Sequence, residues 1–415
     1  MLLSEELKWR GFVHQSTFNE LTDLDKSTLT FYWGVDPSAD SMTIGNLAAA
    51  MLVKCLIKHG YKPVLLVGGA TGLIGDPDGK ADERSIKPMT EIQHNKEAII
   101  KEYRNLFSGV DLKIVDNYDW FKGMTYLDFL RDVGKHVPMS QMLAREFVQT
   151  RLGENGSGIS YAEFSYVLIQ AYDFLVLNDR YGVSLQVCGS DQWGNSIAGV
   201  DLIRRKTGKE AHVYSVPLIV NKATGKKFGK SEEGAIWLNP TKTTPTTFYQ
   251  FWINADDAGV EDYLKVYTEL DPSSVSAIMQ EQLQNPEKRP AQKLLAHEVT
   301  KLVHGPVQTQ AAEAVTEVLV DNSRIAEISD EVAAVLRAEV SSATTNSGGT
   351  IVDALVAAGL AVSKTDARRL LQSNAISING QKVSRDNFIP EDFINGRLLI
   401  RRGKAFKDTA VIELG

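Results

Sequence analysis

Short apolar runs alternate with amphipathic stretches along the first 240 residues of the chain. The apolar runs occupy residues 30–35, 63–67, 112–115 and 184–187, and turn residues bound each one, which is typical of strands buried on both faces. Helical periodicity marks the segments between them, over residues 44–58, 91–106, 126–133, 161–178 and 194–207. The alternation predicts an α/β domain with a doubly wound parallel sheet over residues 1–243.

Glycines stand where three of the predicted strands end. They are Gly34, the pair Gly68-Gly69, and Gly189. Ligands of open α/β sheets bind beyond the carboxyl ends of the strands. We therefore expect the functional site along the edge of the sheet that these glycines mark.

The pattern changes after residue 243. Apolar residues recur at helical spacing up to about residue 338, which predicts a helical domain over residues 244–340. Residues 341–350 (SSATTNSGGT) are rich in Ser, Thr and Gly and predict a flexible linker. Residues 351–415 predict a small α+β unit, with two short helices, a hairpin at Asn379-Gly380 and a final pair of strands.

Composition narrows the class of protein. The chain has 415 residues, a net charge of −7 and two cysteines, without a CxxC motif or a Cys/His cluster. This cysteine usage argues against a disulfide framework or a structural zinc site and fits a reducing compartment. The charged N-terminus and the lack of a long apolar run predict a cytoplasmic protein with no signal peptide and no membrane span.

Charge is uneven along the chain. Residues 351–415 carry 10 Lys/Arg and 7 Asp/Glu, whereas the first 350 residues carry 35 and 45. An acidic body with a mildly basic tail suits a protein that contacts RNA at selected places, because Lys and Arg bind phosphates. Ordinary scatter of charge explains the counts equally well.

Two separated segments carry the features of a nucleotide site. Residues 36–46 (DPSADSMTIGN) run from a strand end into a helix start, whose unpaired N–H groups attract anions; Thr43 stands at that start. Residues 227–231 (KFGKS) place Lys227 and Lys230 on a glycine-softened loop, where lysines can stabilise a leaving pyrophosphate. Taken alone, the first segment is explained by a capped turn and the second by a solvated loop. Together, and in this order, they favour an ATP site.

Three other residues can reach an anion, although each has an ordinary explanation. Ser38 either donates to a phosphate or caps its own turn. Lys80 and Arg84 lie in a polar segment that is a solvated loop by default.

A polar stripe on one predicted helix indicates a pocket for a small polar ligand. Tyr166, Gln170 and Asp173 fall at i, i+4 and i+7, hence on one face of a helix that is otherwise apolar nearly all round. Burying such groups unpaired is costly, so the stripe favours a pocket over a solvated face. Asp76 ends a glycine-rich passage, and Asp191 follows a strand directly, where a carboxylate can bind ribose hydroxyls.

The sequence offers no Ser-His-Asp set and no acid pair with metal-site spacing. Chemistry at such an ATP site needs no protein nucleophile, because a substrate carboxylate can attack the α-phosphate while positioning and charge stabilisation supply the rate. Mg²⁺ then accompanies ATP as part of the substrate. We expect no permanently bound cofactor and no metal held by the protein.

Eight motifs, taken together, resemble those of bacterial tyrosine–tRNA ligases (tyrosyl-tRNA synthetases), which are class I aminoacyl-tRNA synthetases. They are 31–46 (FYWGVDPSADSMTIGN), 68–77 (GGATGLIGDP), 117–120 (NYDW), 129–136 (FLRDVGKH), 164–174 (FSYVLIQAYDF), 189–195 (GSDQWGN), 226–231 (KKFGKS) and 248–254 (FYQFWIN). The resemblance covers essentially the whole chain, and 367–383 (ARRLLQSNAISINGQKV) looks like an S4-type RNA-binding fold. It implies a Rossmann-like catalytic domain, a helical anticodon-side domain and an S4-type domain over residues 351–415.

The resemblance also implies a role for each matching residue. On the tyrosine side, Tyr32 and Asp173 are expected to bind the phenol hydroxyl. The α-ammonium group is expected to be bound by Asp76, Tyr166 and Gln170, and Gln192 is expected to lie near the carboxylate. The ATP side is expected to consist of Gly34, Asp36, Ser38, Gly45, Gly189, Asp191 and Lys230. The expected catalytic residues are Lys80, Arg84, Lys227 and Lys230, which bind pyrophosphate, with Thr43 and Asn46 in place of the two histidines of the HIGH motif.

The implied activity is ATP-dependent ligation of L-tyrosine to tRNA(Tyr) by a homodimer. Tryptophan–tRNA ligase is the close alternative, and Tyr32 and Asp173 argue against it because an indole has no hydroxyl. An RNA-binding paralogue without catalysis is a second alternative. It is motivated by the basic tail and by the TIGN motif (residues 43–46), which stands in place of HIGH. Trp33 replaces a smaller residue that is usually seen beside the ribose in this family. Its ring is expected either to stack on the ribose or to crowd it.

Overall fold

The computed structural model of the chain describes residues 1–77, 87–153, 156–222, 224–225, 228–231, 234–346, 348–403 and 405–415, without the side chains of residues 146, 147, 230 and 231. The chain packs as two units. One consists of Met1–Lys242 with Ala255–Ala291, and the other of Thr243–Asn254 with Gln292–Gly415.

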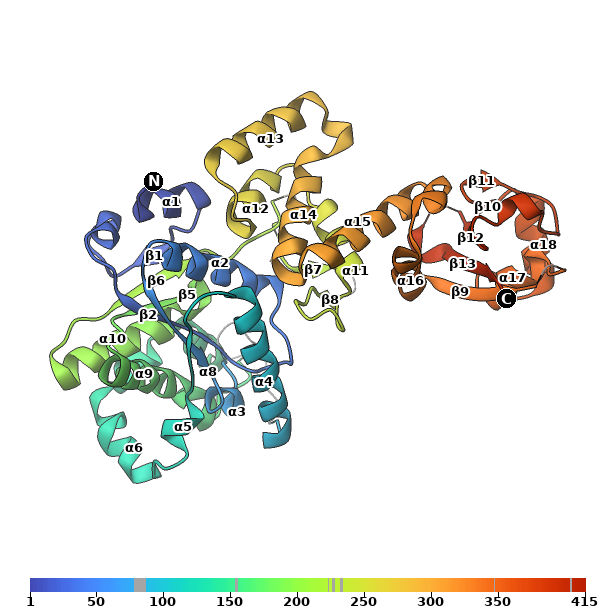
Figure 1. The fold of residues 1–415 in the computed structure, drawn as a ribbon. Coiled ribbons are helices and arrows are strands. Elements are labelled where there is room, and N and C mark those ends of the chain that lie inside the picture. The colour runs from blue at the N-terminus through green and yellow to red at the C-terminus, as the bar shows by residue number, and fades with distance from the viewer. Residues whose placement is uncertain are drawn as a thin grey trace. The chain divides into compact units, whose positions relative to one another are not determined.

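The first unit is built on a sheet with the strand order β1-β6-β5-β2-β3-β4. Figure 1 labels β1, β6, β5 and β2 of this sheet. Its strands are β1 (Gln15–Ser16), β2 (Thr30–Val35), β3 (Lys62–Val67), β4 (Lys113–Asp116), β5 (Leu185–Gly189) and β6 (His212–Val216). From β6 to β4 the neighbours run parallel, and the edge strand β1 is antiparallel to β6. Chain order reverses between β5 and β2, which creates the switch point where ligands of such sheets bind.

Helices cover both faces of this sheet. On one face, α9 (Tyr161–Tyr181) and α10 (Trp193–Thr207) share a core with the sheet that includes Phe174 and Leu202. On the other face, Tyr103 of α4 (Met89–Leu106) packs against Trp33 of β2. The other elements of the unit are α1 (Leu3–Arg10), α2 (Ile44–Lys58), α3 (Thr71–Ile74), α5 (Tyr118–Phe121), α6 (Tyr126–Asp132), α7 (Met139–Leu143), α8 (Glu146–Leu152), β7 (Lys230–Ser231), β8 (Gly234–Ala235), α12 (Val260–Tyr267) and α13 (Pro272–Gln284).

The predicted doubly wound parallel sheet is confirmed. β2 and α2 have the predicted bounds, and the other predicted strands and helices of this domain are present with small shifts at their ends. β6 and α1 were missed. His212 and Ser215 interrupt the apolar run of β6, so its sequence lacks the continuous pattern of a doubly buried strand.

The second unit begins with helices and ends with a small sheet. Its helices are α11 (Pro245–Ile253), α14 (Pro290–His304), α15 (Pro306–Val320), α16 (Asp330–Glu339), α17 (Ile351–Ala357) and α18 (Lys364–Gln372). Its strands are β9 (Ser341–Thr345), β10 (Ile376–Ile378), β11 (Gln381–Lys382), β12 (Arg397–Arg402) and β13 (Thr409–Leu414), in the order β11-β10-β12-β13-β9. The predicted hairpin is confirmed, since Asn379 and Gly380 join β10 and β11 with φ of 45° and 84°.

The expectation of a flexible linker over residues 341–350 is wrong for its first half. Ser341–Thr345 form β9, which pairs in parallel with β13 along its whole length. An edge strand needs little apolar surface of its own, because backbone hydrogen bonds to its neighbour hold it and threonine suits an extended chain. Ala343 of β9 also packs against the core of the small sheet.

A second apolar cluster joins the small sheet to the helices before it. Leu399 and Val411 of the sheet lie in one cluster with Val315 and Leu319 of α15 and Leu336 of α16. In the described part of the chain, no helix has the length and hydropathy of a membrane span.

Candidate active site

A cavity of about 990 Å³ opens at the carboxyl ends of β2, β3 and β5 in the first unit. Its wall includes the start of α2 and one stripe of α9. The site therefore lies at the switch point that the order of the strands defines. The residues predicted for the site that line it are Tyr32, Gly34, Asp36, Ser38, Thr43, Gly45, Asn46, Asp76, Tyr166, Gln170, Asp173, Gly189, Asp191 and Gln192.

The two segments predicted to hold ATP lie against each other. Gly229 of the KFGKS segment has a φ of +103°, and a Cβ there would lie 2.8 Å from Cγ1 of Ile44. Glycine is thus required both for its backbone conformation and for its close approach to α2. The N–H of Ile236 donates to the carbonyl of Gly229 at 3.2 Å, and the N–H of Ile44 donates to the carbonyl of Ile236 at 3.1 Å. The helix start and the KFGKS segment therefore form one wall.

Four predicted phosphate-binding cations are not placed by the structure. Lys80, Arg84 and Lys227 lie outside the described residues. Lys230 begins β7, and its side chain is also outside the description.

Thr43 and Asn46, the residues in place of the HIGH histidines, bind each other. The carboxamide oxygen of Asn46 accepts hydrogen bonds from the N–H of Thr43 at 3.0 Å and from its hydroxyl at 3.1 Å. This arrangement caps α2 and leaves the amide nitrogen of Asn46 as the part of that side chain available to a ligand. The hydroxyl of Thr43 must leave Asn46 before it can donate to a phosphate.

The cavity wall includes a buried carboxyl group and a buried phenol. Asp173 and Tyr32 are each 1% exposed. Asp173 accepts hydrogen bonds from the amide of Asn117 at 3.0 Å and from the indole N–H of Trp120 at 2.8 Å. Among the described residues, the hydroxyl of Tyr32 has no hydrogen-bond partner. Such a buried donor is satisfied when a ligand brings a polar atom to it.

Burial dominates the protonation of this pair. It raises the pKa of Asp173 well above the usual range, against the opposing effect of the hydrogen bonds from Asn117 and Trp120. Burial also raises the pKa of the Tyr32 hydroxyl, and the neighbouring Asp173 raises it further. Tyr32 therefore keeps its proton and can act as a donor.

A second polar group lies where α9 meets the ends of β2 and β3. The hydroxyl of Tyr166 donates to Asp36 at 2.8 Å, and the hydroxyl of Thr71 donates to the other oxygen of Asp36 at 2.6 Å. Gln192 donates to Asp76 through its side-chain amide. The residues predicted for the ammonium group and for the adenosine side are therefore joined by hydrogen bonds, which the sequence did not indicate.

Close approach explains two glycines at the edge of the sheet. A Cβ on Gly68 would lie 2.0 Å from Oδ1 of Asp36, and one on Gly189 would lie 2.6 Å from Oδ1 of Asp191. Neither position can carry a side chain without moving a carboxylate of the cavity wall. Trp33 also lines the cavity, and its ring packs against Tyr103 at 5.4 Å between centroids.

Comparison with known proteins assigns the chain to a family. A family model described as tRNA synthetases class I (W and Y) matches residues 24–320, and one described as the tyrosine–tRNA ligase SYY-like C-terminal domain matches residues 327–406. The chain is 44% identical to the tyrosine–tRNA ligase of Geobacillus kaustophilus over 423 residues, which cover 97% of this chain and 98% of that one. The chain belongs to the tyrosine–tRNA ligase family.

Other members of the tyrosine–tRNA ligase family agree with this assignment. The ligase of Staphylococcus carnosus is 42% identical over 419 residues, or 97% of either chain. A C-terminally truncated mitochondrial tyrosyl-tRNA synthetase of Aspergillus nidulans has a TM-score of 0.69 and 29% identity, and covers 77% of this chain and 94% of its own. A tryptophanyl-tRNA synthetase of Encephalitozoon cuniculi, with 15% identity and a TM-score of 0.54 over 80% of this chain and 92% of that one, shares the fold alone.

Sequence reasoning missed several residues that line or support this cavity. Asn117 and Trp120 belong to the NYDW motif, yet their contact with Asp173 was not expected. Gln186 lines the cavity, is 3% exposed and pairs in register with Tyr32; its side-chain oxygen has no hydrogen-bond partner among the described residues. A lone amide inside an apolar strand was the available signal, because such a group needs a partner. Lys87, ion-paired with Glu91, was also missed.

Proposed function

We propose that this chain activates L-tyrosine with ATP and then transfers it to the 3′ end of tRNA(Tyr). The observation that carries the proposal is the buried pair Tyr32 and Asp173 in the same cavity as the TIGN helix start and Gly189. A pocket lined by a phenol donor and by the buried carboxyl group of Asp173 suits an aromatic ligand with a hydroxyl group. It suits neither phenylalanine nor tryptophan, because neither brings a hydroxyl group to the Tyr32 donor, which would stay unpaired.

The reaction has two steps. In the first, a carboxylate oxygen of tyrosine attacks the α-phosphorus of ATP, the bond to the bridging oxygen breaks, and pyrophosphate leaves with the electron pair. In the second, a hydroxyl of the terminal ribose of tRNA attacks the tyrosyl carbonyl, loses its proton, and displaces AMP. Neither step needs a protein nucleophile, so the protein contributes alignment and stabilisation of developing charge.

Each part of the site has a proposed task. Tyr32 and Asp173 hold the phenol hydroxyl, whereas Asp76, Tyr166 and Gln170 hold the ammonium group, with Gln192 beside the carboxylate. Gly34, Asp36, Ser38, Gly45, Gly189 and Asp191 surround the nucleotide. Lys80, Arg84, Lys227 and Lys230 neutralise the departing pyrophosphate, together with Thr43 and Asn46 at the start of α2.

Mg²⁺ enters with ATP as part of the substrate. Its charge neutralises the phosphates, and the described carboxylates of the cavity have other tasks. Asp36 accepts from Tyr166 and Thr71, and Asp76 accepts from Gln192. We therefore assign no metal ligands to the protein.

The second unit is the proposed RNA-binding part. It contains residues 327–406, which match the SYY-like C-terminal domain. The helix α18 places Arg368 and Arg369 at its surface, and Arg369 is 77% exposed. Exposed arginines on one helix suit contact with RNA phosphates. Since its substrate is tRNA and its two cysteines are free and buried, we propose that the enzyme acts in the cytoplasm.

A homodimer is proposed from exposed apolar side chains on α6 to α9. They are Tyr126, Leu127, Met139, Leu152 and Tyr161, which are 53–75% exposed. The hydroxyls of Tyr126 and Tyr161 lie 3.2 Å apart, so the start of α9 continues the surface of α6. Exposed side chains that adjoin, as those of Tyr126 and Tyr161 do, are typical of protein interfaces when apolar residues surround them. Sedimentation equilibrium tests this proposal, and a monomer at micromolar concentration would contradict it.

Exchange of labelled pyrophosphate into ATP tests the proposed activity. We expect exchange that depends on tyrosine and stays at background with phenylalanine or tryptophan. Exchange with tryptophan alone would instead assign the chain to the other amino acid of its subclass. Background exchange with every amino acid, in a folded sample, would favour an RNA-binding protein without catalysis.

A further inference from the structure

The KFGKS segment is anchored by its aromatic residue. Phe228 is 7% exposed, and its ring stacks on that of Tyr263 with 4.2 Å between centroids and 23° between planes. A second ring of α12, that of Tyr267, lies 6.0 Å away. The N–H of Phe228 also donates to the carbonyl of Ile219 at 2.9 Å. Phe228 is therefore held in place within the KFGKS segment, where it follows Lys227 in sequence and precedes Lys230 by two residues.

Tyr263 is itself held in one orientation. It is 1% exposed, and its hydroxyl donates to Asp256 at 2.9 Å. A Cβ on Gly259 would lie 2.5 Å from the phenol ring, so the glycine makes room for the ring against the start of α12. A fixed ring is a better stacking platform than one that rotates freely.

The far end of α12 is tied to the N-terminal helix. Arg10 of α1 donates to the carbonyls of Lys265 and Thr268, both at 2.7 Å. Lys265 lies in the last turn of α12 and Thr268 follows the helix as its C-cap, where carbonyls lack partners within the helix. Arg10 is 5% exposed and is held by Glu6 at 2.9 Å.

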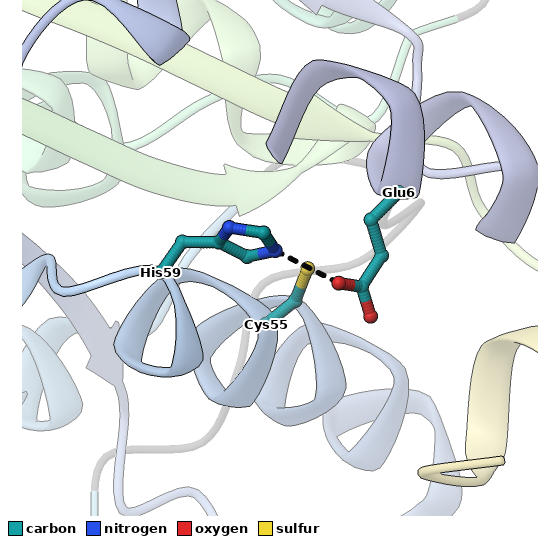
Figure 2. Close-up of side chains that lie close together, drawn as sticks. All are labelled: Glu6, Cys55 and His59. Carbon is teal, nitrogen blue, oxygen red and sulfur yellow. Dashed lines mark hydrogen bonds and ion pairs between the residues drawn. The ribbon is translucent and has the colours of Figure 1, made fainter. Parts of the chain in front are cut away.

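Glu6 carries the same connection on to α2 (Figure 2). Its carboxylate accepts from His59 at 2.8 Å and from Lys58 at 3.0 Å, with Cys55 close by. A carboxylate, a thiol and an imidazole so close together have the donor types of a metal site. Arg10 and Lys58 already neutralise the carboxylate, however, and would repel a divalent cation. The cluster instead ties α12 to α2, the helix that begins with the TIGN motif.

We propose that Tyr263 is a positioning residue for the activation step. By stacking on Phe228 it holds the KFGKS segment against Ile44 at the start of α2. The inference rests on the proposed role of Lys227 and Lys230 in binding pyrophosphate. Misplacing a charged group by about 1 Å can cost on the order of 10²-fold in rate, so loss of the stacking platform should lower the rate of activation.

Two substitutions of Tyr263 separate the ring from its hydroxyl. Tyr263→Leu removes the ring, and we expect kcat of tyrosine-dependent pyrophosphate exchange to fall about tenfold and KM for ATP to rise. The dissociation constant for tyrosine should stay within about twofold of the unchanged protein, because the tyrosine pocket is not touched. Tyr263→Phe keeps the ring and should restore near-normal exchange. A merely structural role would not produce this division between ATP and tyrosine.

Controls keep the test decisive. Tyr61 is a buried tyrosine whose hydroxyl donates to the carbonyl of Leu24, so Tyr61→Leu reports the general cost of losing such a side chain. It should lower stability without lowering kcat. If Tyr263→Leu does not fold, Phe228→Leu removes the other ring and should lower kcat in the same way. If both fold, the double variant should lose no more than the larger single loss.

Lys230→Gln distinguishes failure of the inference from failure of the proposed function. If Lys230→Gln lowers exchange and Tyr263→Leu does not, the positioning role is overturned and the pyrophosphate role stands. If Lys230→Gln leaves exchange unchanged, the proposed role of the lysine fails. Equal losses for Tyr263→Leu and Tyr263→Phe would also overturn the inference, because the hydroxyl rather than the stack would then matter.

Discussion

At the scale of single residues, the pocket keeps one acceptor and one donor away from water. Asp173 is satisfied on one side by Asn117 and Trp120, while the hydroxyl of Tyr32 has no partner among the described residues. Leaving a buried polar group unpaired costs about 1–3 kcal/mol. A substrate with a hydroxyl at the right place recovers that cost, and one without it does not.

Tyr32→Phe tests this account of selectivity. It removes one hydrogen bond to the phenol hydroxyl, so we expect kcat/KM for tyrosine to fall about tenfold, or about 1.4 kcal/mol. The value for phenylalanine should stay unchanged. Pyrophosphate exchange with each amino acid measures both, and a parallel fall in the two values would contradict the assignment.

Thr43→Ala tests the residue that replaces the first HIGH histidine. We expect the rate of adenylate formation to fall several-fold, with the dissociation constant of tyrosine unchanged, because Thr43 lines the cavity at the helix start that we propose binds the phosphates. Loss of its hydrogen bond to Asn46 should also lower stability by about 1 kcal/mol. Stopped-flow fluorescence and equilibrium binding measure the two effects. Thr43→Ser should retain the rate, and a collapse of tyrosine affinity in Thr43→Ala would contradict the placement.

The sequence predicts a residue when its local spacing carries the information. Tyr166, Gln170 and Asp173 were found as one stripe because a helix repeats every 3.6 residues. The bond from Tyr166 to Asp36 joins residues 130 positions apart, so no local pattern indicates it. The same holds for Asn117, which reaches Asp173 from the loop after β4.

At the scale of elements, a charge network rather than apolar packing alone holds α1 to α2. Burial acts to raise the pKa of Glu6, but hydrogen bonds from His59, Lys58 and Arg10 together outweigh it and lower the pKa to about 2. A carboxyl group with a lowered pKa in the folded protein contributes stability above its ordinary pKa of 4.5 and loses it as the pH falls toward 2.

Glu6→Gln should therefore have an effect that depends on pH. At pH 7 we expect the variant to unfold more easily by about 2–3 kcal/mol. The difference should shrink steadily below about pH 4.5, as the native carboxylate becomes protonated. Urea unfolding between pH 3 and 7 measures it, with Glu5→Gln on the exposed face of α1 as the control. A difference that does not change with pH would contradict the network.

Element prediction succeeded where one rule sufficed. Continuous apolar runs predicted β2 and β3, and helical periodicity predicted α2 and α9. It failed at β9, where pairing with β13 decides the conformation of a segment with no strand pattern of its own. Tertiary pairing of this kind cannot be read from local propensity.

At the scale of the whole molecule, the proposed sites of activation and of RNA binding fall in different units. All described cavity residues belong to the first unit, and the SYY-like C-terminal domain belongs to the second. Deleting residues 347–415 is a poor test of this division, because it removes the partner of β9 and opens the cluster around Leu319. Substitutions on the surface of α18 test the division without removing these contacts.

Reversing charge at Arg368 and Arg369 should separate the two activities. We expect the variant with glutamate at both positions to bind tRNA about tenfold more weakly or worse, because contacts with phosphates are lost. Tyrosine-dependent pyrophosphate exchange should be unchanged, since it needs no RNA. Filter binding measures the affinity for tRNA, and pyrophosphate exchange measures the activation step. Unchanged tRNA binding would place the RNA contact elsewhere.

The central claim is that Tyr32 and Asp173 together bind the hydroxyl of the amino acid beside the nucleotide site. A crystal structure with L-tyrosine bound measures this most directly. We predict that the phenol oxygen lies within hydrogen-bond distance of both side chains, with the ammonium group near Asp76 and Gln170. A tyrosine ring bound elsewhere, or a hydroxyl that touches neither Tyr32 nor Asp173, would contradict the account.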